Sequence, residues 1–198
     1  MKVNIRQYDP SDEEEWIRCH FLSYYDSIYL DELINMKPRY EGLVIQLIAT
    51  FDEEIVGILD IEIEQEAGQF GSDETSRCGM ISVIGVIPQF RCKGIGTTLL
   101  FKAQNILIRN YNIHRVEIWI REDLSTLAWL EKNDFLKIHH YYQIKLSKDF
   151  FEKYGIIIPF EVNPVTLIGD VEDESFKQLS QEHSPEISFK IIGLEKFF

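Results

Sequence analysis

The stretch VIPQFRCKGIGTT, residues 86–98, decides the fold, because it joins a strand, a tight turn and the start of a helix. Residues 79–87 form a continuous apolar run of strand length, which is typical of a central strand buried on both faces. Residues 94–110 carry apolar side chains at helical spacing and predict an amphipathic helix. Gly94 and Gly96 stand where this helix begins, and glycine lets a ligand approach the backbone closely.

The turn before this helix is suited to an anion such as a pyrophosphate. The first N–H groups of a helix lack intrahelical partners and lie at the positive end of the helix dipole. Arg91 and Lys93 add positive charge. A Walker loop would require lysine after Gly96, and a dinucleotide-binding fingerprint would require glycine in place of Leu99. A glycine-rich turn without a ligand is the third alternative.

Hydrophobic periodicity predicts a mixed α/β fold around this stretch. A mostly antiparallel sheet of about seven strands, with about four flanking helices, should contain a parallel pair in its middle. The predicted strands are residues 3–8, 43–50, 55–64, 79–87, 114–121 and 135–146, and the predicted helices are residues 11–24, 28–35, 94–110 and 124–133. We expect one domain over 1–198, with a core over 1–146, an extension over 147–185 that includes a helix over 172–182, and a terminal strand over 186–198 that rejoins the sheet.

Composition excludes several classes of protein. The 33 acids outnumber the 20 bases among 198 residues, and a net charge of −13 argues against a nucleic-acid binder. Three distant cysteines (Cys19, Cys78, Cys92) match neither a disulfide framework nor a metal clip, and His20 and His114 have no partners at metal-ligand spacing. No apolar run approaches the roughly 20 residues of a membrane span. We therefore expect a cytoplasmic protein without a metal, a membrane or a nucleic acid.

The charges are segregated along the chain. Residues 40–74 contain ten acids and no base, whereas residues 75–116 contain six bases and no acid. Neighbouring segments of opposite potential could hold an anion on one side and a cation on the other. A solvated acidic hairpin beside an ordinary basic helix is the alternative.

The spacing of Arg91, Gly94 and Gly96 after a strand ending in Val-x-Pro resembles the acetyl-CoA loop of the GNAT superfamily of N-acetyltransferases. The resemblance covers residues 1–146 and implies a GNAT-like fold with acetyl-CoA as co-substrate. It implies acetyl transfer to the primary amine of a small cationic molecule or a peptide, by a monomer or a homodimer. A catalytically weak acyl-CoA-binding or sensor module is the alternative function.

The resemblance also implies roles for individual residues. Backbone groups of Ile84 and Val86 would pair with the pantetheine arm like an added strand, and one of their N–H groups would polarise the thioester carbonyl. The N–H groups from Arg91 to Thr97 would hold the pyrophosphate. The complete implied set of cofactor-binding residues is Ile84, Val86, Ile87, Arg91, Cys92, Lys93, Gly94, Ile95, Gly96, Thr97, Asp123 and Thr126.

Residues 123–135 resemble the second cofactor motif of the family, N-x-x-A-x-x-[LF]-Y-x-K-x-G-F. Asp123 replaces the asparagine, Leu130 the tyrosine and Asp134 the glycine. That tyrosine commonly protonates the leaving thiolate, so Leu130 removes this source of a proton. The strand before the loop also has Met80 and Ser82 where many relatives have a carboxylate base.

Glu62 and Glu64 are the predicted general bases. They share one face of their strand with Asp60, because the side-chain period of a strand is two. Either carboxylate could take a proton from an ammonium, directly or through water. A solvated face of an edge strand is the alternative.

Overall fold

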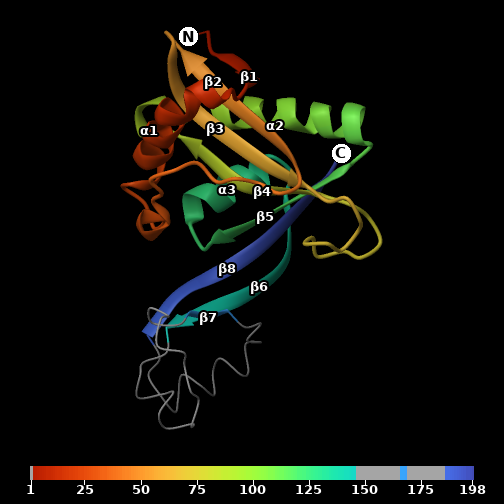
Figure 1. Ribbon diagram of the computed structural model, residues 1–198. Helices are drawn as coiled ribbons and strands as arrows, with labels where there is room; N and C mark the ends of the chain where they lie inside the picture. The colour runs from red at the N-terminus through yellow and green to blue at the C-terminus, as the bar shows by residue number, and fades with distance from the viewer. Residues whose placement is uncertain (1, 146–165, 169–185) are drawn as a thin grey trace. The chain divides into compact units, whose positions relative to one another are not determined.

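The computed structural model describes residues 2–145, 166–168 and 186–198 (Figure 1). The chain divides into two compact units. The first comprises Met1–Ile118, Glu131–Leu136 and Glu195–Phe198, and the second comprises Trp119–Leu130 and Lys137–Leu194. In the described part of the chain, no helix combines the length and the apolar character needed to cross a bilayer.

The first unit is built on an antiparallel sheet that ends in a parallel pair. Its antiparallel strands, in spatial order, are β1 (Asn4–Gln7), β2 (Leu43–Phe51), β3 (Glu54–Ile63) and β4 (Gly79–Val86). β5 (Arg115–Arg121) then runs parallel to β4, in register from Gly79 opposite Val116 to Ile81 opposite Ile118. This confirms the predicted mixed fold with a parallel pair around the glycine-containing turn.

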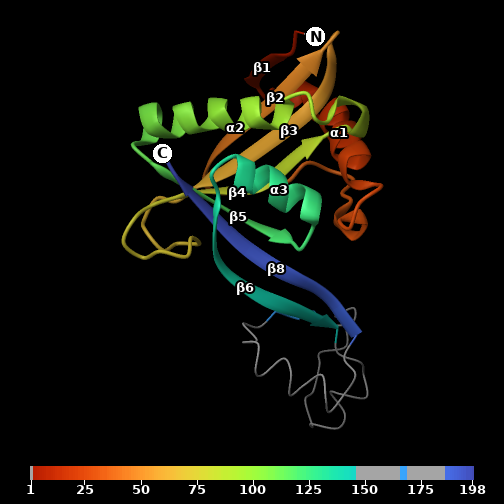
Figure 2. The same cartoon turned by 180° about the vertical axis from the view of Figure 1, so that it is seen from behind.

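Two helices lie on opposite faces of this sheet (Figures 1 and 2). α1 (Glu13–Tyr24) buries Trp16 and Cys19 in one apolar cluster with side chains from β2, β3 and β4. α2 (Ile95–Ile106) packs so closely on β3 that a Cβ at Gly57 would lie 3.0 Å from the side chain of Ile95. The neighbouring residues Gly57 and Ile58 of β3 therefore face α2 and α1, respectively.

Most predicted boundaries agree with the structure within two residues, but the helix predicted over 28–35 is wrong. Its place is taken by a single 3-10 turn at Leu30–Glu32. Ile28 and Leu30 are exposed, so the segment buries no apolar stripe that could stabilise so short a helix. The helix predicted over 94–110 ends as α2 at Ile106 and continues as a π-helical turn over Leu107–Tyr111.

The second unit contains the end of β5, most of α3 (Leu124–Lys132), β6 (Leu136–Lys145), β7 (Thr166–Ile168) and β8 (Glu186–Phe197). Its strands follow the order β5, β8, β6, β7, and β6 pairs antiparallel with β7. A Cβ at Gly193 would lie 2.8 Å from the ring of Trp119, so glycine there lets the indole lie against β8. β8 is the predicted terminal strand. The helix predicted over 172–182 lies outside the described residues, and the single domain stays a prediction.

Candidate functional site

On the outer edge of β4, two residues direct their N–H and C=O groups away from β3. Ile87 donates its N–H to the carbonyl oxygen of Val56 at 3.1 Å, and Gly85 lies opposite Ile58 in the same antiparallel register. Antiparallel partners alternate between the two edges of a strand, so the N–H and C=O groups of Ile84 and Val86 point away from β3. These are the residues expected to pair with an extended ligand.

β4 pairs with β5 at its first residues. The parallel register of β4 with β5 covers Gly79–Ile81 only. Two side chains instead reach the carbonyl groups beyond it: the Tyr24 hydroxyl donates to Ile84 at 3.2 Å, and Arg91 Nε donates to Val86 at 3.0 Å. The N–H groups of Ile84 and Val86 lie beyond this register, on the edge of β4 that points away from β3.

The turn after β4 leads directly into the N-terminus of α2. A 3-10 turn at Pro88–Phe90 is followed by Gly94, which caps α2 with a φ of 78° and without a side-chain cap. No atom lies within 4 Å of a Cβ built at Gly94, so its backbone conformation, rather than crowding, requires glycine. The exposed start of an uncapped helix offers N–H groups to an anion. The implied loop residues Ile87, Cys92, Ile95, Gly96 and Thr97 belong to this same strand, turn and helix start.

The two basic side chains of the turn contact the protein itself. Arg91 Nη2 donates to the carbonyl oxygen of Ser23 at 2.8 Å, which fastens the turn to the end of α1. Lys93 Nζ donates to the carbonyl oxygen of Gln89 at 2.9 Å and lies 5.1 Å from the ring centre of Phe90. Both side chains therefore stabilise the turn, and direct contact of either with an anion stays a prediction.

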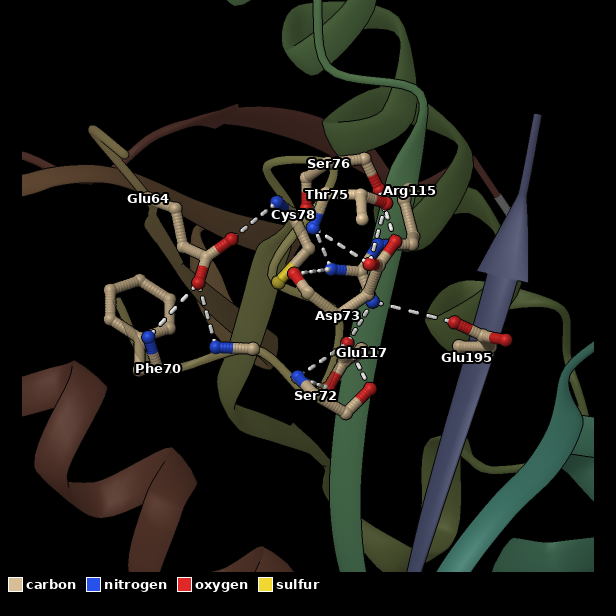
Figure 3. A network of polar contacts seen from close by, with 11 residues as sticks. Glu64, Phe70, Ser72, Asp73, Thr75, Ser76, Cys78, Arg115, Glu117 and Glu195 are labelled. Atoms are coloured by element: carbon tan, nitrogen blue, oxygen red, sulfur yellow. Dashed lines mark hydrogen bonds and ion pairs between the residues drawn. The ribbon is translucent and has the colours of Figure 1, made fainter. Parts of the chain in front are cut away.

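Glu64 is bound by backbone groups of the loop that follows it. Its buried carboxylate accepts N–H groups from Phe70 at 2.9 Å, Gly71 at 2.7 Å and Cys78 at 2.8 Å (Figure 3). Burial acts to raise the pKa of Glu64, but these hydrogen bonds together lower it. Glu64 therefore has a structural role, because its carboxylate holds the following loop; the sequence analysis missed this role.

Glu62 differs from Glu64, since it lies within β3 and accepts the Ser82 hydroxyl at 2.5 Å. β3 is paired with β2 on one side and β4 on the other, so the alternative interpretation of an edge strand is wrong. The strand ends at Ile63, so Glu64 already belongs to the loop. The general-base role of Glu62 and Glu64 stays a prediction.

An ion pair on β5 holds the same loop from the other side. Glu117 is buried, bonds to Arg115, and accepts the N–H and hydroxyl groups of Ser72 (Figure 3). Arg115 also donates to the carbonyl oxygen of Ser76 at 2.8 Å. A Cβ at Gly71 would lie 2.6 Å from Cys78 Sγ, so glycine is needed where the loop crosses this network.

A second buried ion pair lies on the α1 side of the sheet. Lys37 contacts Asp60, and its ammonium lies 4.2 Å from the ring centre of Trp16 and 4.8 Å from that of Tyr8. The Tyr40 hydroxyl donates to Asp60 at 2.9 Å. Burial favours the neutral forms of both groups, which raises the pKa of Asp60 and lowers that of Lys37. Asp60 therefore belongs to a buried ion pair, whereas Glu62 on the same strand contacts the Ser82 hydroxyl.

The second cofactor motif begins with a helix cap. The Asp123 carboxylate accepts the N–H groups of Ser125 at 3.2 Å and Thr126 at 3.0 Å, at the start of α3. Burial acts to raise the pKa of Asp123, but the hydrogen bonds from Thr126 and Ser125 outweigh it and lower the pKa. An aspartate caps a helix as well as an asparagine does. A cofactor contact of Asp123 or Thr126 stays a prediction.

The other two departures from the motif also have structural explanations. Leu130 is fully buried, so an apolar side chain suits the position of the family's tyrosine. Asp134 has a φ of 63°, which explains why glycine is usual there and why aspartate, which tolerates this region, can replace it.

Comparisons with known proteins agree with this geometry. The model of the acetyltransferase (GNAT) family matches residues 6–135. No curated protein has significant sequence similarity to the chain.

Solved structures show the same fold at low identity. NAA60 from Arabidopsis thaliana, in complex with a bisubstrate analogue, has 15% identity and a TM-score of 0.59, covering 99% of this chain and 98% of that one. A ribosomal-protein-alanine N-acetyltransferase from Brucella melitensis has 13% identity and a TM-score of 0.62, covering 98% and 99%. The PaiA N-acetyltransferase from Thermoplasma acidophilum, in complex with coenzyme A, has 14% identity and a TM-score of 0.53, covering 100% of both chains.

Proposed function

Because the chain belongs to the GNAT family of acetyltransferases, we propose that it transfers the acetyl group of acetyl-CoA to the primary amine of a small cationic molecule or a peptide. The observation that carries this proposal is the outer edge of β4. There the backbone units of Ile84 and Val86 lie beyond the register with β5 and lead into the uncapped N-terminus of α2. An extended arm would pair with the edge of β4, and a pyrophosphate at the end of that arm would reach the N-terminus of α2.

The backbone groups of β4 and of the start of α2 match the groups that acetyl-CoA would present to them. The N–H groups of Ile84 and Val86 would pair with the pantetheine arm, and the N–H groups at the start of α2 would hold the pyrophosphate. Open space around Gly94 leaves room for phosphate oxygens. Bound acetyl-CoA supplies the thioester, and an N–H group of β4 stabilises the negative charge that develops on its carbonyl oxygen.

The charge of the segment after α1 supports a cationic acceptor. Residues 25–36 contain three acids, Asp26, Asp31 and Glu32, and no lysine or arginine. An acidic surface attracts an ammonium group and raises its local concentration. Peptide acceptors are supported by the similarity to an alanine N-acetyltransferase that acts on a ribosomal protein.

Transfer can be tested by measuring free thiol released from acetyl-CoA with a panel of amines. The panel should contain spermidine, lysine derivatives and peptides with free N-termini, with reactions lacking an amine as controls. We expect thiol release that depends on at least one cationic amine. Calorimetric binding of acetyl-CoA without turnover on any amine would instead favour an acyl-CoA-binding or sensor module, for which the buried Leu130 is the supporting observation.

We also propose that the protein is cytoplasmic and that it can form a homodimer. The three distant cysteines favour a reducing compartment. Cell fractionation tests the location, and light scattering of the purified protein over a concentration series tests the assembly.

A further inference from the structure

The hydroxyl of Tyr24 lies on the edge of β4 where the thioester is expected. Tyr24 is the last residue of α1, and its hydroxyl donates to the carbonyl oxygen of Ile84 at 3.2 Å. The N–H and C=O groups of one strand residue point to the same edge. A group bound to the Ile84 N–H would therefore lie next to the Tyr24 hydroxyl.

The position of this hydroxyl is fixed from several directions. The Tyr24 ring stacks on His20 with a centroid distance of 4.2 Å, and His20 stacks on Trp16 at 5.4 Å. A Cβ at Gly85 would lie 3.3 Å from the Tyr24 ring, so glycine there lets the ring rest directly on β4. The bond between Arg91 and Ser23 fastens the adjoining residue to the turn.

Two carboxylates in or next to β3 are engaged in structural contacts. Glu64 is held by the backbone of its loop, and Asp60 is paired with Lys37. Leu130 provides no proton at the position of the family's tyrosine. The Tyr24 hydroxyl has one contact with a carbonyl oxygen, which a better acceptor on the same edge could replace.

We propose that Tyr24 gives its hydroxyl proton to the departing thiolate of coenzyme A; this rests on the proposed acetyl transfer. When the tetrahedral intermediate collapses, the carbon–sulfur bond breaks and sulfur keeps the electron pair. The Tyr24 O–H bond breaks, and its proton forms the thiol. In the same step the Tyr24 oxygen takes the proton that the attacking nitrogen must lose, so one proton passes in total from the amine to sulfur and no free tyrosinate forms. Burial, together with nearby Glu32 and Asp60, raises the pKa of Tyr24, so the hydroxyl carries its proton at neutral pH.

The test compares Tyr24→Phe with wild type in the full chain. Phenylalanine keeps the ring stack and removes only the hydroxyl. Thiol release is measured with acetyl-CoA and the amine that the panel identifies, and acetyl-CoA binding is measured by calorimetry. We expect kcat to fall by about 100-fold, with the Kd of acetyl-CoA changed by less than about twofold. The control is Tyr25→Phe, the same change at an exposed neighbouring ring, for which we expect wild-type kcat.

Each outcome separates the inference from the proposed function. If wild type transfers acetyl groups and Tyr24→Phe has the same kcat, the inference is overturned and the function stands. If the whole loss in kcat/KM is matched by weaker acetyl-CoA binding, Tyr24 only shapes β4, and the inference is again overturned. If wild type acts on no amine, the proposed function fails and the inference fails with it.

Discussion

Arg91 and Ser23 join the turn before α2 to the end of α1, through a 2.8 Å hydrogen bond from the guanidinium to the Ser23 carbonyl oxygen. The same guanidinium reaches the Val86 carbonyl oxygen, so one side chain connects a helix, a strand and a turn. The geometry requires a planar fork of donors as well as a positive charge.

Replacing Arg91 therefore tests geometry against charge. Arg91→Ala should lower the free energy of unfolding by about 1–3 kcal/mol, because two hydrogen bonds from a charged group are lost. Arg91→Lys keeps the charge but not the fork, and we expect it to recover less than half of the loss. Denaturant unfolding measures both variants. Full recovery in Arg91→Lys would show that the charge alone matters.

Gly94 tests the conformation at the start of α2. Its φ of 78° disfavours any residue with a Cβ, although the space around it is open. Gly94→Ala should cost about 1–2 kcal/mol of stability, and Gly94→Asn less, because asparagine tolerates left-handed backbone. Gly94→Val should also abolish acetyl-CoA binding in calorimetry while the protein still melts cooperatively. Unchanged affinity in Gly94→Val would place the pyrophosphate elsewhere.

Glu64 makes the stability of the loop depend on pH. Its pKa is lower in the folded protein, so the ionised carboxylate stabilises the fold above its ordinary pKa, and this contribution is lost as the pH falls through the lowered value. Glu64→Gln should therefore destabilise the protein by about 1–3 kcal/mol at pH 7. The difference from wild type should shrink in acid. Unfolding curves measured at neutral and acidic pH check this, and a difference that grew in acid would contradict it.

Lys37 and Asp60 should behave as a coupled pair. Lys37→Met leaves Asp60 buried without its partner, and we expect a loss of about 3–5 kcal/mol of stability. Adding Asp60→Asn removes the uncompensated charge, so the double variant should be more stable than Lys37→Met alone. A double-mutant cycle by denaturant unfolding measures the coupling. Additive losses would show that the two groups act independently.

The sequence predicted most of the fold because its signals are periodic and local. The apolar run before Pro88 and the helical spacing after Gly94 each identify an element without knowledge of distant contacts. The helix predicted over 28–35 failed because Ile28 and Leu30 are exposed, so their burial could not stabilise so short a helix. The spacing of apolar residues along the sequence does not show whether those residues are buried.

The candidate site was predicted less completely. The acids of residues 40–74 looked like a solvated or substrate-facing group, but Glu64 is buried against the loop that follows it and Asp60 is buried against Lys37. Glu64 binds mainly backbone N–H groups, which no residue pattern reveals. Arg115 and Glu117 carried a signal that the sequence analysis did not use, because opposite charges two apart on a strand lie on the same face.

The outer edge of β4 has a consequence for how such a protein can diverge. Ile84 and Val86 present main-chain groups, and every residue except proline supplies the same N–H and C=O groups. Substitutions on this strand can change packing on either face and leave the edge chemically the same. Chains only 13–15% identical to this one share its fold, so the same main-chain edge can persist while the side chains around it differ.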